Sequence, residues 1–262
     1  MPDTSLVLSQ FDPSTGIARI VLNRPDRLNA IGPAMAEEFR DAALAAVGRD
    51  GLRCVVLQAN GRAFAAGGDV STFSDPATAG KVIDQILGPM HEGLLALRQA
   101  PAPVVTAVQG MAAGAGFSLA LCGDLVFAAE SVSFAVAYTR LGGTPDCGLT
   151  WSLSRRIGRA RTLEFLLRDA VIDARAAGEL GLVTEILPDA GFEAAVEERV
   201  ARLAEGPTRA FVACRDILSD PGSFEVQLGR ERETFVASAG SRDFGEGVAA
   251  FRERRDPNFE GR

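Results

Sequence analysis

The sequence predicts an α/β fold that is followed by a helical C-terminal region. Two short apolar runs, residues 54–59 and 104–108, are continuous enough to be strands covered on both faces of a sheet. The neighbouring segments 33–48 and 80–99 carry apolar residues at helical spacing. Because strands and helices alternate through the first half of the chain, we expect a layered core of both element types.

The remaining elements follow one another without a long linker. Residues 5–10 and 17–22 are β-rich runs separated by the turn-forming segment DPSTG, which predicts a hairpin at the start of the fold. Later segments have only helical patterns, broken by Gly and Pro: 160–169, 173–180, 192–217 and 223–255. We therefore expect an α/β core over residues 1–190 and a helical region over residues 191–262.

Composition and charge exclude several classes of protein. With 47% hydrophobic and 23% charged residues, the 262-residue chain is globular. The 27 Lys and Arg residues against 34 Asp and Glu residues give a net charge of −7, which argues against a nucleic-acid or polybasic membrane-binding surface. No basic segment followed by an apolar stretch begins the chain, and no uninterrupted apolar run reaches ~18 residues. We expect a cytoplasmic protein with no membrane partner.

The cysteines and the single histidine also restrict the chemistry. Cys54, Cys122, Cys147 and Cys214 are scattered without CxxC spacing, so neither a disulfide framework nor a zinc site is indicated. His91 is the only histidine, which excludes a multi-histidine metal centre. It lies in an apolar helical stretch, and we assign it no role. The sequence predicts no metal and no resident cofactor.

Two glycine-rich stretches follow predicted strands. They are residues 61–69 (GRAFAAGGD) and 110–118 (GMAAGAGFS). Small side chains let backbone N–H groups approach a ligand, and a helix N-terminus adds donors without partners. Two such donors that face each other would form an oxyanion hole. Close packing where a strand meets a helix explains the same residues, so spacing alone leaves both interpretations open.

These stretches belong to a longer series of motifs that resembles the enoyl-CoA hydratase/isomerase (crotonase) superfamily. The motifs stand in the family's order and cover nearly the whole chain: NRP at 23–25, LNA at 28–30, AFAAGGD at 63–69, VQG at 108–110, AG at 115–116, CGD at 122–124 and RRDP at 254–257. The resemblance implies a crotonase-like spiral of ββα units with a helical C-terminal trimerisation region, and hence a homotrimer or a dimer of trimers. It also implies an acyl-CoA thioester substrate, with coenzyme A present as part of that substrate.

The resemblance further implies how the thioester is held. Its oxygen would accept hydrogen bonds from the backbone N–H groups of Gly68 and Ala115. Ala115 stands where the family usually has glycine, and an alanine in helical conformation keeps the N–H. Asp69 is expected to accept hydrogen bonds from loop amides and to fix the loop.

Other candidates for substrate binding lie in or beside the same motifs. They are Ala30, Ala66, Gly67, Gly114, Tyr138 and Trp151. Tyr138 and Trp151 would line an acyl pocket, and so would Phe64, Phe117 and Phe134. The alternative for all five is that they are core residues, as aromatic residues are by default. Arg24, Arg254 and Arg255 are candidates for the phosphates of coenzyme A, with solvated surface arginines as the alternative.

The acid/base group decides which reaction is expected. Hydratases of the family use two glutamates, and the matching positions here are Ser118 and Tyr138. Neither is a carboxylate, and neither hydroxyl is an adequate general base near neutral pH without an activating partner. Crotonase-type hydration is therefore not the reaction that the sequence favours.

A different carboxylate, Asp146, is available in the segment LGGTPDCGLTW at 141–151. This segment resembles the one that carries the catalytic aspartate in 1,2-epoxyphenylacetyl-CoA isomerases, although Leu149 stands where that pattern has a second glycine. The alternative is that Asp146 caps a helix beginning near Gly148, a common use of Asp after Pro.

These assignments predict an acyl-CoA isomerase. A single carboxylate suffices to take a proton from one carbon and return it to another, so Asp146 would move the proton while Gly68 and Ala115 stabilise the enolate charge. The same group could assist the opening of an epoxide. Two alternatives stay open: an enoyl-CoA hydratase or other crotonase-type enzyme, and a non-catalytic acyl-CoA-binding protein that has lost its glutamates.

Overall fold

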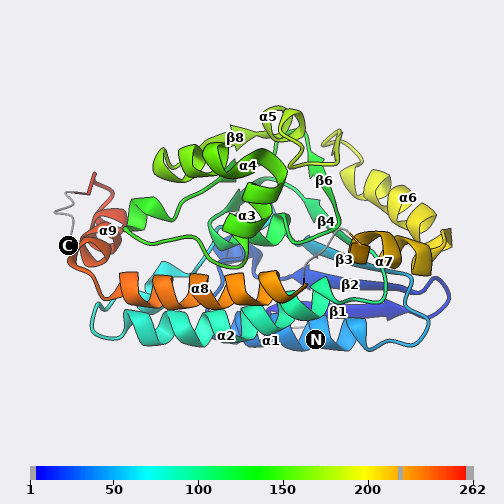
Figure 1. Ribbon diagram of the computed structural model, residues 1–262, viewed down its shortest axis with the longest axis horizontal. Coiled ribbons are helices and arrows are strands. Elements are labelled where there is room, and N and C mark those ends of the chain that lie inside the picture. Colours follow the sequence, from blue (N-terminus) through cyan, green and yellow to red (C-terminus); the bar gives the residue numbers. More distant parts are fainter. Residues whose placement is uncertain (1–3, 218–220, 258–262) are drawn as a thin grey trace.

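A six-stranded sheet forms the centre of the molecule, shown in Figure 1 as a computed structural model that describes residues 4–217 and 221–257. Its strands in spatial order are β1 (Val7–Asp12), β2 (Ile17–Leu22), β3 (Cys54–Ala59), β4 (Val104–Val108), β6 (Leu125–Ala129) and β9 (Glu185–Leu187). The β1–β2 pair is antiparallel, which confirms the predicted hairpin, and the other pairs are parallel.

Helices cover both faces of this sheet. On one face, side chains such as Val55 and Leu57 of β3 pack with α1 (Pro33–Val47) and α2 (Ala79–Arg98). On the other face, the alternate residues Cys54 and Val56 pack with α6 (Phe192–Glu205). A central strand buried on both sides needs apolar residues at successive positions, which explains the continuous apolar runs of the sequence.

A smaller sheet stands beside the first and was not predicted. It consists of β5 (Met111–Ala113), β7 (Ser133–Ala135) and β8 (Val171–Asp173), with β5 parallel and β8 antiparallel to the middle strand β7. Each strand is three residues long, too short to show an alternating pattern. The short helix α3 (Ala115–Ala120) follows β5 directly, so this sheet positions the second glycine-rich stretch.

The predicted helical regions are present with different boundaries. They are α4 (Leu149–Leu167), α5 (Ala174–Glu179), α6, α7 (Thr208–Ile217), α8 (Pro221–Ala239) and α9 (Arg242–Glu253), with 3-10 turns at Pro25–Arg27, Val70–Phe73 and Thr139–Leu141. The α4 helix begins well before the predicted residue 160 and is kinked at Gly158, whose φ is +76°. None of the helices in residues 4–217 and 221–257 is both long and apolar enough to cross a membrane.

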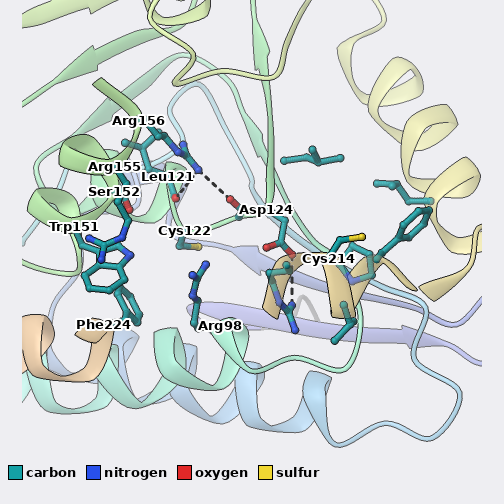
Figure 2. A pocket seen from close by; sticks show the side chains of 17 residues that line it. Arg98, Leu121, Cys122, Asp124, Trp151, Ser152, Arg155, Arg156, Cys214 and Phe224 are labelled. Atoms are coloured by element: carbon teal, nitrogen blue, oxygen red, sulfur yellow. Dashed lines mark hydrogen bonds and ion pairs between the residues drawn. The ribbon is translucent and has the colours of Figure 1, made fainter. Parts of the chain in front are cut away.

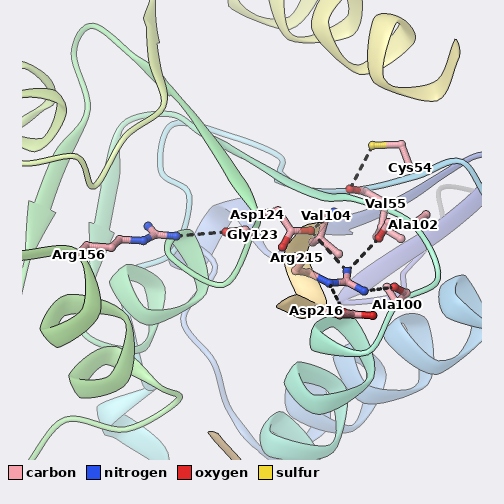
Figure 3. Close-up of polar contacts among 10 residues, drawn as sticks. All are labelled: Cys54, Val55, Ala100, Ala102, Val104, Gly123, Asp124, Arg156, Arg215 and Asp216. Carbon is pink, nitrogen blue, oxygen red and sulfur yellow. Dashed lines mark hydrogen bonds and ion pairs between the residues drawn. The ribbon is translucent and has the colours of Figure 1, made fainter. Parts of the chain in front are cut away.

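The C-terminal helices pack on the core. The α8 helix runs along α2 (Figure 1). On α7, the Arg215 guanidinium donates to the carbonyl oxygens of Ala100 at 2.6 Å and Ala102 at 3.3 Å, and lies 3.5 Å from a carboxylate oxygen of Asp124 (Figure 3). Asp124 also accepts the Val104 N–H at 2.9 Å, so one arginine ties α7 to the start of β4.

Candidate active site

A cavity of about 620 Å³ opens between the two glycine-rich stretches, α2 and the C-terminal helices. It brings together nine of the residues predicted for the site: Ala30, Ala66, Gly67, Gly68, Asp69, Gly114, Ala115, Tyr138 and Asp146. Its remaining wall is largely apolar, with Phe73, four side chains of α2 and Phe235 of α8. A pocket with apolar walls and a few polar groups suits a ligand that is itself mostly apolar.

The Gly68 N–H faces this cavity. Ile31 pairs with the loop in a parallel bridge, because its N–H donates to the Gly67 carbonyl at 2.8 Å and its carbonyl accepts the Asp69 N–H at 2.9 Å. Successive N–H groups of an extended segment point to opposite sides. The N–H of the intervening Gly68 therefore points away from Ile31, toward the cavity that Gly68 lines.

The Ala115 N–H is the second donor. Ala115 is the first residue of α3, where an N–H has no acceptor within the helix, and its helical conformation meets the condition stated for it. In the described residues, neither this N–H nor that of Gly68 donates to a protein atom. A Cβ on Gly67 would lie 3.6 Å from the Ala115 nitrogen, so the two segments that carry the donors are in contact.

Close packing, the other interpretation of the glycines, also holds at a neighbouring position. A Cβ on Gly116 would lie 2.1 Å from the Ala65 carbonyl oxygen, which no side chain tolerates. Ala65 in turn bridges to Ala112 of β5. Gly116 thus brings α3 against the first glycine-rich stretch, and this approach brings together the two segments that carry the N–H donors.

Asp69 fixes its loop as predicted. One carboxylate oxygen accepts the Ser71 N–H at 3.2 Å and the Ser71 hydroxyl at 2.6 Å, and the other accepts Nη1 of Arg24 at 2.7 Å. Burial alone would raise the pKa of Asp69, but the hydrogen bonds and charge of these partners hold the pKa below its usual value. Asp69 therefore stays ionised, and both of its carboxylate oxygens already accept hydrogen bonds from neighbouring residues.

The predicted arginines lie outside the cavity lining. Arg24 is held by Asp69 and by the Ala30 carbonyl, at 2.9 Å. Arg254 ends α9 in a left-handed conformation, and it is the neighbouring Arg252 that lines the cavity, together with Arg27 of the first 3-10 turn. Arg140 also lines the cavity, so three arginines that were not predicted stand at its wall, and the assignment of Arg24, Arg254 and Arg255 to the phosphates of coenzyme A stays a prediction.

Asp146 is the centre of a buried hydrogen-bonded group. It is 3% exposed, and its carboxylate accepts the Tyr138 hydroxyl at 2.5 Å. The Ser118 hydroxyl lies 3.0 Å from the Tyr138 oxygen and 2.9 Å from the Asp146 backbone carbonyl oxygen, to which it donates. Ser118 and Tyr138, the positions that match the family's glutamates, thus meet at Asp146.

Burial raises the pKa of Asp146 to about 7. Hydrogen bonds from Tyr138 and Cys147 favour the carboxylate and limit this rise, whereas the negative charge of Glu231 adds to it. For Tyr138, burial together with the Asp146 charge moves the pKa well above its usual value, so this hydroxyl stays protonated and donates. Asp146 is a carboxyl group that can both take and give a proton near neutral pH.

The Asp146 side chain does not cap α4, so the alternative role predicted for it is wrong. Gly148 is the N-cap residue of α4, and no Asp146 carboxylate oxygen accepts from the described first turn. The carboxylate of Glu231 on α8 accepts the Gly148 N–H instead, at 2.7 Å. Glu231 lies 83 residues away along the chain, and no local sequence signal points to this contact.

The aromatic candidates other than Tyr138 lie outside the cavity, which corrects the pocket role predicted for Trp151. Trp151 lines a separate cavity of about 660 Å³, between the Arg155 guanidinium and the Phe224 ring (Figure 2). It sits in the first turn of α4 and packs against Phe224 of α8. Phe64, Phe117 and Phe134 are core residues with no exposed surface.

Comparison with known proteins shows the family and the fold of the chain. The enoyl-CoA hydratase/isomerase family model matches residues 12–262. The chain is 41% identical to a probable enoyl-CoA hydratase of Rhodobacter capsulatus over 97% of this chain and 98% of that protein, and 34% identical to the 1,2-epoxyphenylacetyl-CoA isomerase of Escherichia coli K12 over 94% and 96%. An enoyl-CoA hydratase structure from Mycobacterium avium subsp. paratuberculosis superposes with a TM-score of 0.87 at 30% identity, covering 98% of this chain and 99% of that one. The chain belongs to the enoyl-CoA hydratase/isomerase family and has the crotonase fold.

Proposed function

We propose that this protein is an acyl-CoA isomerase in which Asp146 alone moves the proton. The observation that carries the proposal is the contrast between the two carboxyl groups that line the cavity of about 620 Å³. Asp69 is ionised and held by Arg24 and Ser71, whereas Asp146 is buried with a pKa of about 7. Efficient proton transfer needs a group that titrates near the working pH, and Asp146 meets this condition.

The reaction would begin at the thioester. Its carbonyl oxygen accepts the N–H groups of Gly68 and Ala115, which stabilise negative charge on that oxygen. The Asp146 carboxylate takes a proton from the carbon next to the carbonyl, and the bonding pair enters the carbonyl system as an enolate. Protonated Asp146 then delivers a proton to a carbon further along the acyl chain, so the double bond moves and no atom is gained or lost.

The surroundings of Asp146 favour this reaction over addition of water. Hydration needs a second group to transfer the other proton, and the nearest candidates are Ser118 and Tyr138. Tyr138 stays protonated because its pKa is raised by burial and by Asp146, so it is a donor and not a base. Hydration is nevertheless the second candidate function, because the 41% identical relative is named a probable hydratase.

Product mass separates these possibilities. The purified protein would be incubated in D₂O with a panel of unsaturated alkyl and aryl acyl-CoA esters, and the esters analysed by mass spectrometry. An isomerase yields a product isomeric with the substrate that carries deuterium at carbon. A product heavier by one water would contradict the proposal in favour of hydration. Tight binding with neither turnover nor deuterium uptake would favour a non-catalytic acyl-CoA-binding protein.

We also propose that the protein is a homotrimer or a dimer of trimers. Large apolar side chains stand in solvent at the end of α4 and in β8: Leu163 is 44% exposed, Leu167 74% and Val171 56%. Adjacent exposed apolar residues of this kind are typical of surfaces that a second subunit covers. Light scattering coupled to gel filtration measures the assembly directly, and a monomer at micromolar concentration would contradict this proposal.

A further inference from the structure

A buried glutamate of the C-terminal region contacts the start of the helix that follows Asp146. Glu231 of α8 is only 4% exposed. Glutamates are rarely buried unless partners satisfy the carboxylate. Its carboxylate accepts the Gly148 N–H at 2.7 Å, the Thr150 hydroxyl, and the side-chain amide of Gln227 at 3.1 Å. Two of these donors belong to the first turn of α4.

This contact supplies the start of α4 with an acceptor that the local sequence lacks. The first N–H groups of a helix need acceptors, usually from an Asp, Asn, Ser or Thr side chain at the helix start. Gly148 at the N-cap has no side chain, and Asp146 is the nearest residue of a capping type. An Asp146 carboxylate that capped α4 would have to accept N–H groups of the first turn in competition with the Tyr138 hydroxyl that it accepts here.

We propose that Glu231 is a positioning residue that caps α4 in place of Asp146 and thereby leaves the Asp146 carboxyl group directed at Tyr138 and the substrate cavity. This inference rests on the proposed function, since it assigns Glu231 a role in the reaction only through Asp146.

A second contact from the same helix supports the inference. Phe235 lies four residues after Glu231, on the same face of α8. Its ring meets the Tyr138 ring edge-on, with 6.0 Å between the centroids, and a Cβ on Gly143 would lie 2.5 Å from it. The α8 helix therefore holds the segment 138–148 near both ends, at Tyr138 through Phe235 and at Gly148 through Glu231.

Glu231 also acts on Asp146 through its charge. The titratable groups that face Asp146 are Tyr138 and Cys147 of its own segment and Glu231 of α8. The first two donate hydrogen bonds that favour the Asp146 carboxylate, whereas the negative charge of Glu231 disfavours it. Removal of that charge should let Asp146 ionise at a lower pH.

Three single variants test the proposal. Glu231→Ala removes the acceptor, so Asp146 is free to cap α4, and we expect kcat for isomerisation to fall about tenfold with KM changed less than about twofold. Glu231→Gln keeps an acceptor for the Gly148 N–H but no charge, so most of kcat should return and the pH midpoint of the rate should move down. Glu233→Ala, at an exposed position of the same helix, is the matched control and should change neither.

The double variant Glu231→Ala/Asp146→Asn separates this inference from the proposed function. If Glu231 acts through Asp146, its loss should have no further effect once Asp146 is replaced. Wild-type activity in Asp146→Asn alone would contradict the proposed function. An inactive Asp146→Asn with wild-type kcat in folded Glu231→Ala would overturn only the role of Glu231. If Glu231→Ala does not fold, Glu231→Met, which also removes the acceptor but keeps the buried volume, takes its place, and wild-type kcat in folded Glu231→Met overturns the role of Glu231 equally.

Discussion

Asp69 and Asp146 line the same cavity, yet their surroundings shift the pKa of the carboxyl group in opposite directions. Around Asp69, the Arg24 guanidinium and two donors of Ser71 keep the carboxylate ionised. Asp146 is buried beside the neutral Tyr138 hydroxyl, and Glu231 of α8, another acid, lies nearby. Surroundings, not residue type, therefore distinguish a carboxylate that fixes a loop from one that is poised to move a proton.

The largest expected difference between the two segments is in turnover. Asp146→Asn keeps the shape of the side chain but cannot carry a proton, so isomerisation should fall about 10²–10⁴-fold while acyl-CoA affinity changes only a few-fold. The matched control Asp69→Asn keeps the capping oxygen of the loop and should lose far less activity. Steady-state rates and calorimetric binding constants check both variants. Equal losses in the two would show that the aspartates are not functionally distinct.

Loss of a single N–H donor should have the next largest effect. Proline is tolerated at the first position of a helix, so Ala115→Pro deletes the N–H with little disturbance of α3. We expect kcat to fall about 10²–10³-fold, the usual consequence of removing one oxyanion donor. Ala115→Ser retains the N–H and is the control. A folded Ala115→Pro protein, verified by circular dichroism, with near-normal kcat would refute the assigned oxyanion hole.

The two aspartates should also give opposite pH slopes of stability. Between about pH 4 and pH 7 the Asp146 carboxyl is ionised in the unfolded chain but protonated in the folded one, so its contribution to the free energy of unfolding falls as pH rises. Asp69, with a lowered pKa, contributes stability that is lost as pH falls.

Denaturant unfolding at pH 5 and pH 8 measures these contributions. Asp146→Asn should gain about 1–4 kcal/mol relative to wild type on going from the lower to the higher pH, and Asp69→Asn should not gain. A wild-type-like pH profile in Asp146→Asn would mean that Asp146 titrates normally in the folded protein.

A smaller effect is expected at Tyr138. Tyr138→Phe removes the hydroxyl that donates to the Asp146 carboxylate, so the pKa of Asp146 should rise further and the pH midpoint of kcat should move up. At pH 7 we expect a loss of about tenfold that is partly recovered at pH 9. Ser118→Ala, which leaves the Tyr138 contact in place, should shift the midpoint less. An unmoved midpoint in Tyr138→Phe would separate Tyr138 from the titration of Asp146.

The parts of the fold that depend on local pattern could be predicted from the sequence. The strands β3 and β4 have the predicted boundaries, because burial on both faces requires the apolar runs that mark them. The sheet of β5, β7 and β8 could not be predicted, since three-residue strands show no period. The helical pattern predicted only residues 160–169 of α4, and a start near Gly148 was predicted only as the alternative in which Asp146 caps the helix. The start is there, but the acceptor is not local: it comes from Glu231.

The candidate site shows the same division. The segments that carry Gly68 and Ala115 were found from short motifs, and the structure places both at one cavity. The convergence of Ser118 and Tyr138 on Asp146 depends on how α3 and the segment 138–148 pack, which no spacing encodes. Trp151 was misplaced for the same reason, because the direction of its side chain is set by the first turn of α4 and by Phe224.

The central claim is that Asp146 takes the proton from the acyl chain, and deuterium wash-in tests it most directly. The wild-type protein in D₂O, held with its best acyl-CoA ester, should exchange the proton next to the thioester carbonyl at a rate that rises with pH to a plateau, with a midpoint near the Asp146 pKa of about 7. Asp146→Asn should show almost no exchange at any pH while it still binds the ester. Exchange at the wild-type rate in a folded Asp146→Asn protein would contradict the account.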